Sequence, residues 1–130
     1  MASHVYPLAK ESFITGVINL SSDTIKLVLL TSAYTYSAAH QFRSSLSGVI
    51  GSASGAFASK TVALGVFNAA NVTLTAVAGG STIAALAIYK DTGSSATDNL
   101  IAFVDGFSQV TNGGDITVTW DSGASKIFAF

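Results

Sequence analysis

The stretch NGGDITVTW, residues 112–120, decides the fold class of this chain. Its Asn-Gly-Gly start supplies residues that tolerate the positive φ angles of a tight turn. After the turn, Ile116, Val118 and Trp120 alternate with two threonines. Successive side chains of a β-strand point to opposite faces, so the three apolar residues share one face and the threonines the other. The stretch therefore predicts a turn followed by a half-buried strand.

Short apolar runs separated by Gly, Asn or Asp recur through the second half of the chain, and one strong run precedes them. In the run at residues 24–31, alternation gives way after Lys26 to a continuous apolar sequence, which is typical of a strand buried on both faces. Strands at this spacing are typical of sandwiches and barrels. We therefore expect an all-β fold, mainly an antiparallel β-sandwich of jelly-roll-like or related form, with one or two short helices. The expected strands are residues 24–31, 60–67, 72–77, 82–90, 100–107, 115–121 and 126–130.

Two segments favour helical structure. Residues 7–14 begin with Pro7, which suits the first helical position because its missing N–H costs nothing there, and Gly16 marks the expected end. Residues 38–45 are expected to form one or two helical turns with Ser37 as the cap.

The length of 130 residues corresponds to one domain, since domains have roughly 100–200 residues. We expect residues 1–6 to be an N-terminal arm and residues 7–130 to be a single β-sandwich domain. The Gly/Ser/Ala-rich segment at residues 47–58 is too apolar for a disordered linker. It is expected to be a long loop with an irregular edge strand.

The composition predicts an unusual surface. Charged residues make up 10% of the chain, against about 25% in ordinary globular proteins, while hydrophobic residues reach 49%. Many outward positions must therefore be small and neutral, and so cheap to remove from water. Such a surface suits permanent contact with neighbouring subunits, because the centres of interfaces are depleted in charge. A β-rich monomer with a Ser/Thr coat is the alternative.

Several function classes are disfavoured. The net charge is −1 and the six basic residues are scattered singly, whereas nucleic acid requires several on one face. Without cysteine there is no disulfide, thiol catalysis or Cys-ligated zinc. No apolar run approaches the length of about 18 residues that spans a membrane. Residues 1–4 carry no positively charged leader pattern, so we expect synthesis in the cytoplasm.

One pair of motifs suggests chemistry. Residues 91–93 read Asp-Thr-Gly and residues 121–123 read Asp-Ser-Gly, and aspartic proteases bring two such loops together so that the carboxylates share a proton. Here the tripeptides follow one another too closely for a two-lobed enzyme. Lys90 would also hold the first carboxylate ionised. We interpret both motifs as turns, in which Asp accepts a backbone hydrogen bond and Gly adopts a positive φ.

Other catalytic and metal patterns are incomplete. Residues 51–55 resemble a nucleophile elbow, but Ala53 stands where the serine belongs. Aspartates at strand ends in the second half could hold Ca²⁺ through oxygen ligands, yet they lack paired spacing and are expected to cap turns. His40 is expected to be a polar surface residue or to bond a nearby carbonyl. The sequence thus predicts a non-enzymatic protein with no catalytic residue, no metal site and no cofactor.

Aromatic residues are the best candidates for contact. Trp120, Phe103 and Tyr89 lie in expected strands and are assigned to the core. Burying one Phe is worth about 1.5–3 kcal/mol, so the aromatic tail at residues 126–130 is expected to be either a core edge strand or an intersubunit strand. The predicted subunit or capsid contacts are Tyr34, Tyr36, Phe107, Phe128 and Phe130.

Four stretches resemble, in the same order, a family of small virion proteins of tailed bacteriophages: residues 21–30, 34–37, 89–93 and 112–130. The strongest signatures are Ser-Ser-Asp-Thr-Ile-Lys at residues 21–26 and Gly-Gly-Asp-Ile-Thr-Val-Thr-Trp from Gly113 onward. This chain departs from the family by having fewer acidic residues in its middle third and a shorter loop before Asn112.

The resemblance implies a virion structural protein, placed as a capsid decoration (cement) protein on the outer surface of a tailed-phage head. It implies the major capsid protein and other copies of itself as partners, with a homotrimer favoured, and neither nucleic acid nor membrane. Multivalent contact with several capsid subunits would make a modest single contact effectively permanent. A tail or adaptor structural protein and a host-glycan-binding virion module are the alternatives.

Overall fold

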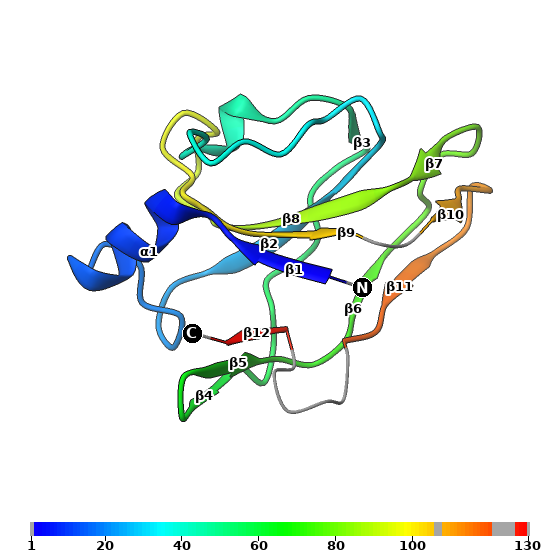
Figure 1. Cartoon of the computed structure of the whole chain (residues 1–130). Coiled ribbons are helices and arrows are strands. Elements are labelled where there is room, and N and C mark those ends of the chain that lie inside the picture. Colours follow the sequence, from blue (N-terminus) through cyan, green and yellow to red (C-terminus); the bar gives the residue numbers. More distant parts are fainter. Residues whose placement is uncertain (1, 106–107, 121–126, 130) are drawn as a thin grey trace.

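The computed structural model describes residues 2–105, 108–120 and 127–129 (Figure 1). The described chain is mostly β-structure, its paired strands run antiparallel, and α1 (Pro7–Ile14) is its single α-helix. The predicted all-β fold with a short helix is therefore confirmed.

A five-stranded sheet forms the centre of the molecule, in the order β1-β9-β8-β2-β3. Its three inner strands are buried along almost their whole length, because both faces of the sheet are covered. This burial explains why the apolar run in β2 is continuous and does not alternate. The strands are β1 (Ala2–Val5), β2 (Ile25–Leu30), β3 (Val49–Ile50), β8 (Ala85–Lys90) and β9 (Leu100–Asp105).

The predicted N-terminal arm at residues 1–6 is wrong for the residues that the structure describes. β1 pairs with β9 in a register from Ala2 opposite Asp105 to Val5 opposite Ala102. Tyr6 is fully buried, and its N–H donates to the Ile101 carbonyl at 3.0 Å. The segment pairs with the free edge of β9, and no local pattern in residues 1–6 could predict that this edge is available.

Shorter ladders form a second group of strands below and beside the central sheet (Figure 1). β12 (Phe128–Ala129), β5 (Val66–Asn68) and β4 (Thr61–Ala63) pair in that order. Two further pairs are β11 (Ile116–Val118) with β6 (Val72–Leu74) and β10 (Gln109–Val110) with β7 (Thr82–Ile83).

α1 is confirmed with its predicted bounds. Pro7 lies in the first turn, and the chain leaves the helix through Thr15 and then Gly16 at φ +79°. The helix predicted at residues 38–45 is reduced to a 3₁₀ turn, Arg43–Ser45. The Ser37 hydroxyl accepts the Ala39 N–H at 3.2 Å, so it closes a local turn and does not cap a helix.

Two predicted strands are interrupted. Residues 60–67 form a hairpin of β4 and β5 and not one strand, because Leu64 and Gly65 both take positive φ angles of 51° and 77°. Residues 82–90 divide into β7 and β8. Gly65 explains the interruption between β4 and β5. No residue pattern predicts the interruption between β7 and β8.

The predicted irregular edge at residues 47–58 is confirmed. β3 pairs with the end of β2, and the chain then continues along the same strand. The Ser54 N–H donates to the Leu27 carbonyl at 2.9 Å, and the Leu27 N–H donates to Ser54 Oγ at 3.1 Å. The edge of β2 is thus covered by hydrogen bonds from a segment too irregular to read as a strand.

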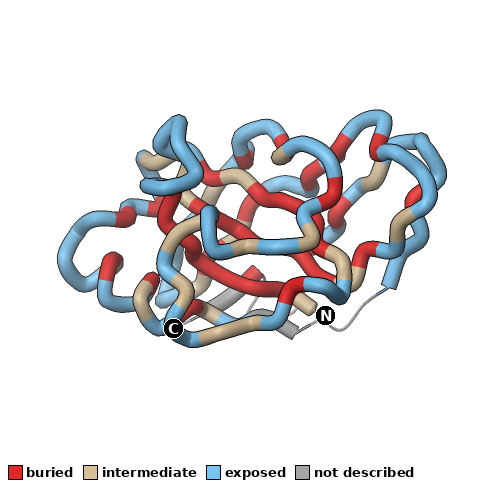
Figure 2. Tube along the Cα trace, turned by 90° about the horizontal axis from the view of Figure 1, so that it is seen from above, coloured by how far each residue is buried: buried red, intermediate tan, exposed pale blue. Residues whose placement is uncertain are grey.

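The core is one contiguous cluster that joins the central sheet to the shorter ladders. Trp120, Phe103 and Tyr89 are all buried in it, as predicted, and Trp120 donates its indole N–H to the Ala70 carbonyl at 3.0 Å. Figure 2 shows the buried segments running through the middle of the molecule, with exposed loops around them.

Candidate functional site: an uncharged surface

Two signature motifs meet at one end of the central sheet. The antiparallel register places Ile25 of β2 opposite Lys90 of β8. The flanking charges then cross: Lys26 Nζ lies 2.8 Å from Asp91 Oδ2, and Lys90 Nζ lies 3.3 Å from Asp23 Oδ2. The Ser-Ser-Asp-Thr-Ile-Lys and Tyr-Lys-Asp-Thr-Gly motifs therefore form one structural unit held by reciprocal ion pairs.

The Asp-Thr-Gly motif at residues 91–93 is a turn, as predicted. The Gly93 N–H donates to Asp91 Oδ1 at 3.1 Å, and Gly93 has φ +93°. The hydrogen bond from Lys26 is the main cause that lowers the pKa of Asp91, and the Gly93 N–H adds to it. Lys26, and not the neighbouring Lys90 as predicted, supplies this charge. The second motif, residues 121–123, lies outside the described residues.

A buried carboxylate closes the same end of the sheet. Asp98 is fully buried and accepts three hydrogen bonds, from Arg43 Nε at 2.7 Å, from the Thr92 N–H at 2.6 Å and from Thr92 Oγ1 at 2.8 Å. The Arg43 guanidinium also lies 4.8 Å from the centre of the Tyr89 ring. Asp115 accepts the Ala76 N–H at 3.0 Å. Both aspartates confirm the expectation that these residues cap turns.

The rest of the sheet and its ladders is left almost without charge. From residue 44 to residue 89 the sequence contains one charged residue, Lys60, and its ammonium donates to the Asp23 carbonyl. This range supplies all of β3 to β7 and most of β8. The two ion pairs thus hold four charges at one end of the sheet, and the strands β3 to β7 carry no charged side chain. We call the exposed parts of residues 44–89 the uncharged surface; in Figure 1, β3 and β7 lie in the upper part of the molecule and β4 and β5 in the lower part.

Large apolar side chains are exposed on the uncharged surface. Val49 on β3 is 44% exposed, Val62 on β4 is 50% exposed, and Leu64 at the hairpin tip is 102% exposed. Val110 on the adjoining β10 is exposed as well. Two further exposed apolar residues lie outside this surface: Ile14 is the last residue of α1, and Val17 follows the helix.

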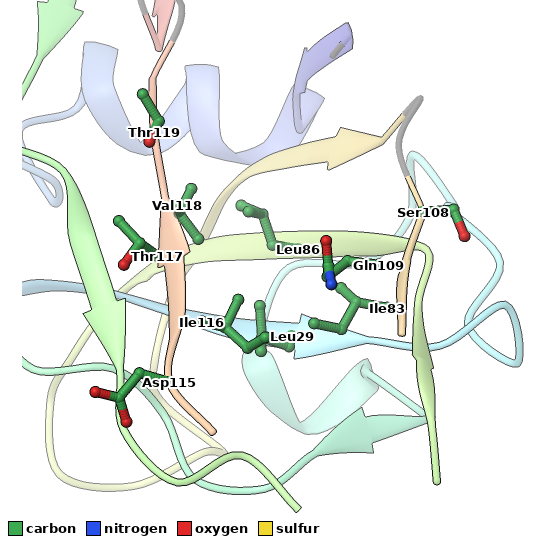
Figure 3. A pocket seen from close by; sticks show the side chains of 10 residues that line it. All are labelled: Leu29, Ile83, Leu86, Ser108, Gln109, Asp115, Ile116, Thr117, Val118 and Thr119. Atoms are coloured by element: carbon green, nitrogen blue, oxygen red, sulfur yellow. The ribbon is translucent and has the colours of Figure 1, made fainter. Parts of the chain in front are cut away.

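A cavity of about 350 Å³ adjoins the same surface, between β11 and the central sheet (Figure 3). Aliphatic side chains from both layers point toward one another in it, and the residues at its rim are mostly uncharged. The aliphatic lining residues are Leu29, Ile83, Leu86, Ile116 and Val118. The alternation in the sequence predicted that Ile116 and Val118 share one face of their strand. It did not predict which strands lie opposite them and complete the cavity.

The structure corrects one of the predicted contact residues. Tyr34 is buried, and its hydroxyl lies 2.7 Å from the Tyr6 hydroxyl and 2.8 Å from His40 Nδ1. It packs in the interior and presents no contact surface, because the buried Tyr6, between β1 and α1, bonds its hydroxyl. His40 accordingly bonds a hydroxyl and not a carbonyl. Tyr36 is half-buried against Tyr6 and Phe103, with ring centres 5.0 and 5.5 Å away.

The predicted contacts at the carboxyl end are only partly described. Phe128 lies in β12, where its backbone is paired opposite Phe67. For residues 127–129 the tail is therefore a core edge strand, the first of its two predicted alternatives, and Ile127 is buried. Phe107 and Phe130 lie outside the described residues.

The other candidate sites lack the required chemistry. Ser54, in the incomplete nucleophile elbow, donates its hydroxyl to the Gly55 carbonyl at 2.8 Å and accepts a backbone N–H. Among the described residues, no three His, Cys, Asp or Glu side chains lie together as metal ligands. In the same part of the chain, no helix has the length and apolar character to cross a membrane.

Comparison with protein-family models, with curated proteins and with solved structures finds no match for this chain. The resemblance to phage virion proteins therefore depends on the sequence motifs alone. Two of those motifs are the pair that the central sheet joins through ion pairs.

Proposed function

We propose that this protein is a non-enzymatic virion structural protein that decorates the capsid of a tailed phage and bridges its major capsid protein subunits. The observation that carries the proposal is the uncharged surface, a continuous range from residue 44 to residue 89 with a single charge turned inward to Asp23.

The physical argument concerns the cost of removing a surface from water. Charged groups are expensive to desolvate, whereas small neutral side chains and aliphatic groups are cheap or favourable to bury. The exposed parts of β3 to β7 can therefore be covered by neighbouring proteins at little cost. The ion pairs between the β2 and β8 ends hold four charges away from these strands. A surface with so few charges is typical of a protein in lasting contact with neighbours. The surface of a freely diffusing monomer ordinarily carries many charges.

The resemblance of the sequence motifs to phage virion proteins favours the phage particle as the partner in this lasting contact. Exposed Val49, Val62 and Leu64 supply apolar contacts on the uncharged surface. Each contact is modest, but a subunit that touches several capsid proteins at once gains effective concentration for every later contact. Copies of this protein in contact with one another would multiply that gain.

The test is binding to expanded phage heads that lack the protein. Purified protein is mixed with the heads, the heads are sedimented, and bound copies per head are counted by quantitative gel densitometry. We expect saturable binding of many copies over the shell. No binding to the shell, or six to twelve copies confined to the tail, would contradict capsid decoration, and the second result would favour the tail or adaptor alternative.

A pair of lysine variants locates the contact surface. Val49→Lys places a charge on the uncharged surface and is expected to weaken head binding at least tenfold, since the ammonium must be desolvated. Ile14→Lys changes a residue that is more exposed, at the end of α1, and is expected to bind as the wild type does. Equal binding by both variants would place the contact elsewhere.

A further inference from the structure

The loop between β10 and β11 contains the one asparagine of this chain that glycine follows. Asparagine amides are among the chemically labile groups of proteins, because the backbone nitrogen of the next residue can attack them. A side chain on the attacking residue obstructs that approach, and Gly113 has none. Asn112, Gly113 and Gly114 are all exposed, and a Cβ built at Gly113 would meet no atom within 4 Å. Water and the attacking nitrogen therefore both have open access to the Asn112 amide.

The Asn112 side chain is folded back along the backbone that follows it. Its Oδ1 accepts the Gly114 N–H at 3.0 Å, so the side-chain carbonyl lies across the Gly113 peptide unit. The hydrogen bond draws electrons from Asn112 Cγ and makes this carbon a better electrophile. Among the described residues, neither the Gly113 N–H nor Asn112 Nδ2 has a hydrogen-bond partner. No competing bond therefore holds the attacking nitrogen or the leaving group.

The loop is anchored on both sides of Asn112. On one side, the Thr111 N–H donates to the Ser81 carbonyl at 2.8 Å, and Thr111 Oγ1 accepts the Ser81 N–H at 3.0 Å. On the other side, the Gly114 carbonyl accepts the Val77 N–H at 3.0 Å. These bonds fix the two ends of the turn and so keep the asparagine side chain close to its neighbour.

We propose that Asn112 is a site of spontaneous covalent modification, at which its amide becomes a carboxylate. The Gly113 nitrogen bonds to Asn112 Cγ, and the Cγ–Nδ2 bond breaks. Nδ2 leaves as ammonia with the proton of the Gly113 N–H, and a succinimide ring remains. Water then adds to either ring carbonyl. Opening at Cγ gives aspartate, whereas opening at the main-chain carbonyl gives isoaspartate, in which the chain runs through the former side chain. Nothing is oxidised or reduced, and water is the co-reactant.

Each product changes the loop in its own way. Aspartate adds a negative charge beside the uncharged surface, to which Gly79 belongs, since a Cβ built at Gly79 would lie 3.4 Å from the Asn112 backbone. Isoaspartate adds one carbon to the main chain between the two anchors, so the bonds to Ser81 and Val77 cannot both persist. The effect of the charge on capsid binding rests on the proposed function, whereas the effect on the anchors does not.

The experiment incubates the purified full chain in mildly alkaline buffer made with heavy-oxygen water. Peptide mapping by mass spectrometry locates the label, and isoaspartyl methyltransferase measures isoaspartate. We expect residue 112 to take up label about tenfold or more faster than every other asparagine, because each of those precedes a residue with a side chain. These internal controls are Asn19, Asn68, Asn71 and Asn99. Uptake at residue 112 no faster than at the controls overturns the proposal.

Two variants distinguish ring closure from direct hydrolysis. Asn112→Gln keeps an amide in the loop but requires a larger ring that forms less readily, so this position should stay unlabelled over the same period. Gly113→Ala places a methyl group on the attacking residue and should slow the uptake. Its thermal unfolding midpoint is recorded as well, because φ at this position is +85°. Labelled aspartate without isoaspartate, or equal uptake by Asn112→Gln, indicates direct hydrolysis and contradicts the proposal.

The consequences are tested separately. In hydrogen exchange, the peptide that covers residues 76–81 should exchange faster in the isoaspartate fraction than in Asn112→Asp protein, which has the charge without the extra carbon. Asn112→Asp should bind phage heads more weakly than its uncharged match, Asn112→Gln. Wild-type protein that takes up label but binds no head overturns the proposed function and leaves this inference intact. Wild-type protein that binds heads but stays unlabelled overturns this inference alone.

Discussion

At the scale of single residues, the structure depends on buried polar atoms that find partners far away in the sequence. The Tyr6 and Tyr34 hydroxyls share a hydrogen bond at 2.7 Å, and the Tyr34 hydroxyl also lies 2.8 Å from His40 Nδ1. This chain ties the end of β1 to the loop that follows β2. Burial is the main cause that raises the pKa of Tyr6, and the hydrogen bond to Tyr34 adds to it. Burial likewise raises the pKa values of Tyr34 and Tyr89.

These shifts predict the response to alkali. Unfolded tyrosine has a pKa of about 10, below the folded-state values of Tyr6, Tyr34 and Tyr89. The folded chain therefore holds protons that the unfolded chain releases, so this stability is complete below about pH 10 and is lost as the pH rises. Tyrosinate absorbance and far-UV circular dichroism, recorded together, should show these three residues ionising only as the fold is lost. Their ionisation in a folded chain would contradict the prediction.

Asp98 supplies a second residue-scale prediction. Asp98→Ala removes the acceptor of three hydrogen bonds and leaves the Arg43 guanidinium without its carboxylate. Breaking such a pair costs about 3 kcal/mol, the lower end of the usual range because Arg43 is partly exposed. Urea unfolding of the variant measures the loss. Asp105→Ala is the control, since this half-exposed carboxylate lies 3.5 Å from His4 Nε2 and its loss should cost less than about 1 kcal/mol.

At the scale of elements, close backbone approach decides where strands begin and end. Gly48 lies at the start of β3 with φ +65°, and its carbonyl accepts the Thr31 N–H at 2.9 Å. A Cβ added there would lie 2.5 Å from Thr31 Oγ1 and 3.0 Å from the Ala33 side chain. Because Thr31, the residue after β2, approaches this closely, position 48 at the entry to β3 requires glycine.

Gly48→Ala should therefore destabilise the β2–β3 edge. The strained φ and the contact with Thr31 together predict a loss of about 2 kcal/mol or more in the free energy of unfolding. Gly55→Ala is the matched control in the same glycine-rich segment, since its φ is not positive and its Cβ would meet no atom within 4 Å. Equal unfolding midpoints in urea for the two variants would show that the close approach is not required.

At the scale of the whole molecule, burial is unequal between the central sheet and the outer ladders. β2, β8 and β9 are buried along nearly their full length, whereas every described residue of β4 and β10 is exposed. Local opening costs least where few apolar groups are buried. The outer strands are therefore the parts of the fold that a neighbouring molecule can stabilise most.

Hydrogen exchange followed by mass spectrometry checks this distribution. In the purified protein, peptides that cover β8 and β9 should exchange slowest, and those that cover β4 and β10 should exchange fastest. Uniform protection across the sheet and the ladders would contradict the prediction.

The sequence by itself determined the all-β class, α1, the buried run of β2 and the turn at residues 91–93. Each of these features depends on residues close together in the chain: an apolar period, a proline at a helix start, or an Asp and a Gly two positions apart. Such local preferences act wherever the segment lies, so a pattern is enough to indicate them.

Only the tertiary structure decided the pairing of β1 with β9, the burial of Tyr34 and the cavity beside β11. The same holds for the crossed ion pairs, in which Lys26 takes the aspartate that its neighbour in sequence, Lys90, seemed placed to hold. In each case the deciding partner lies tens of residues away, and which partner arrives depends on strand order and register. Those are properties of the packed molecule, because long-range contacts form only when the whole core closes.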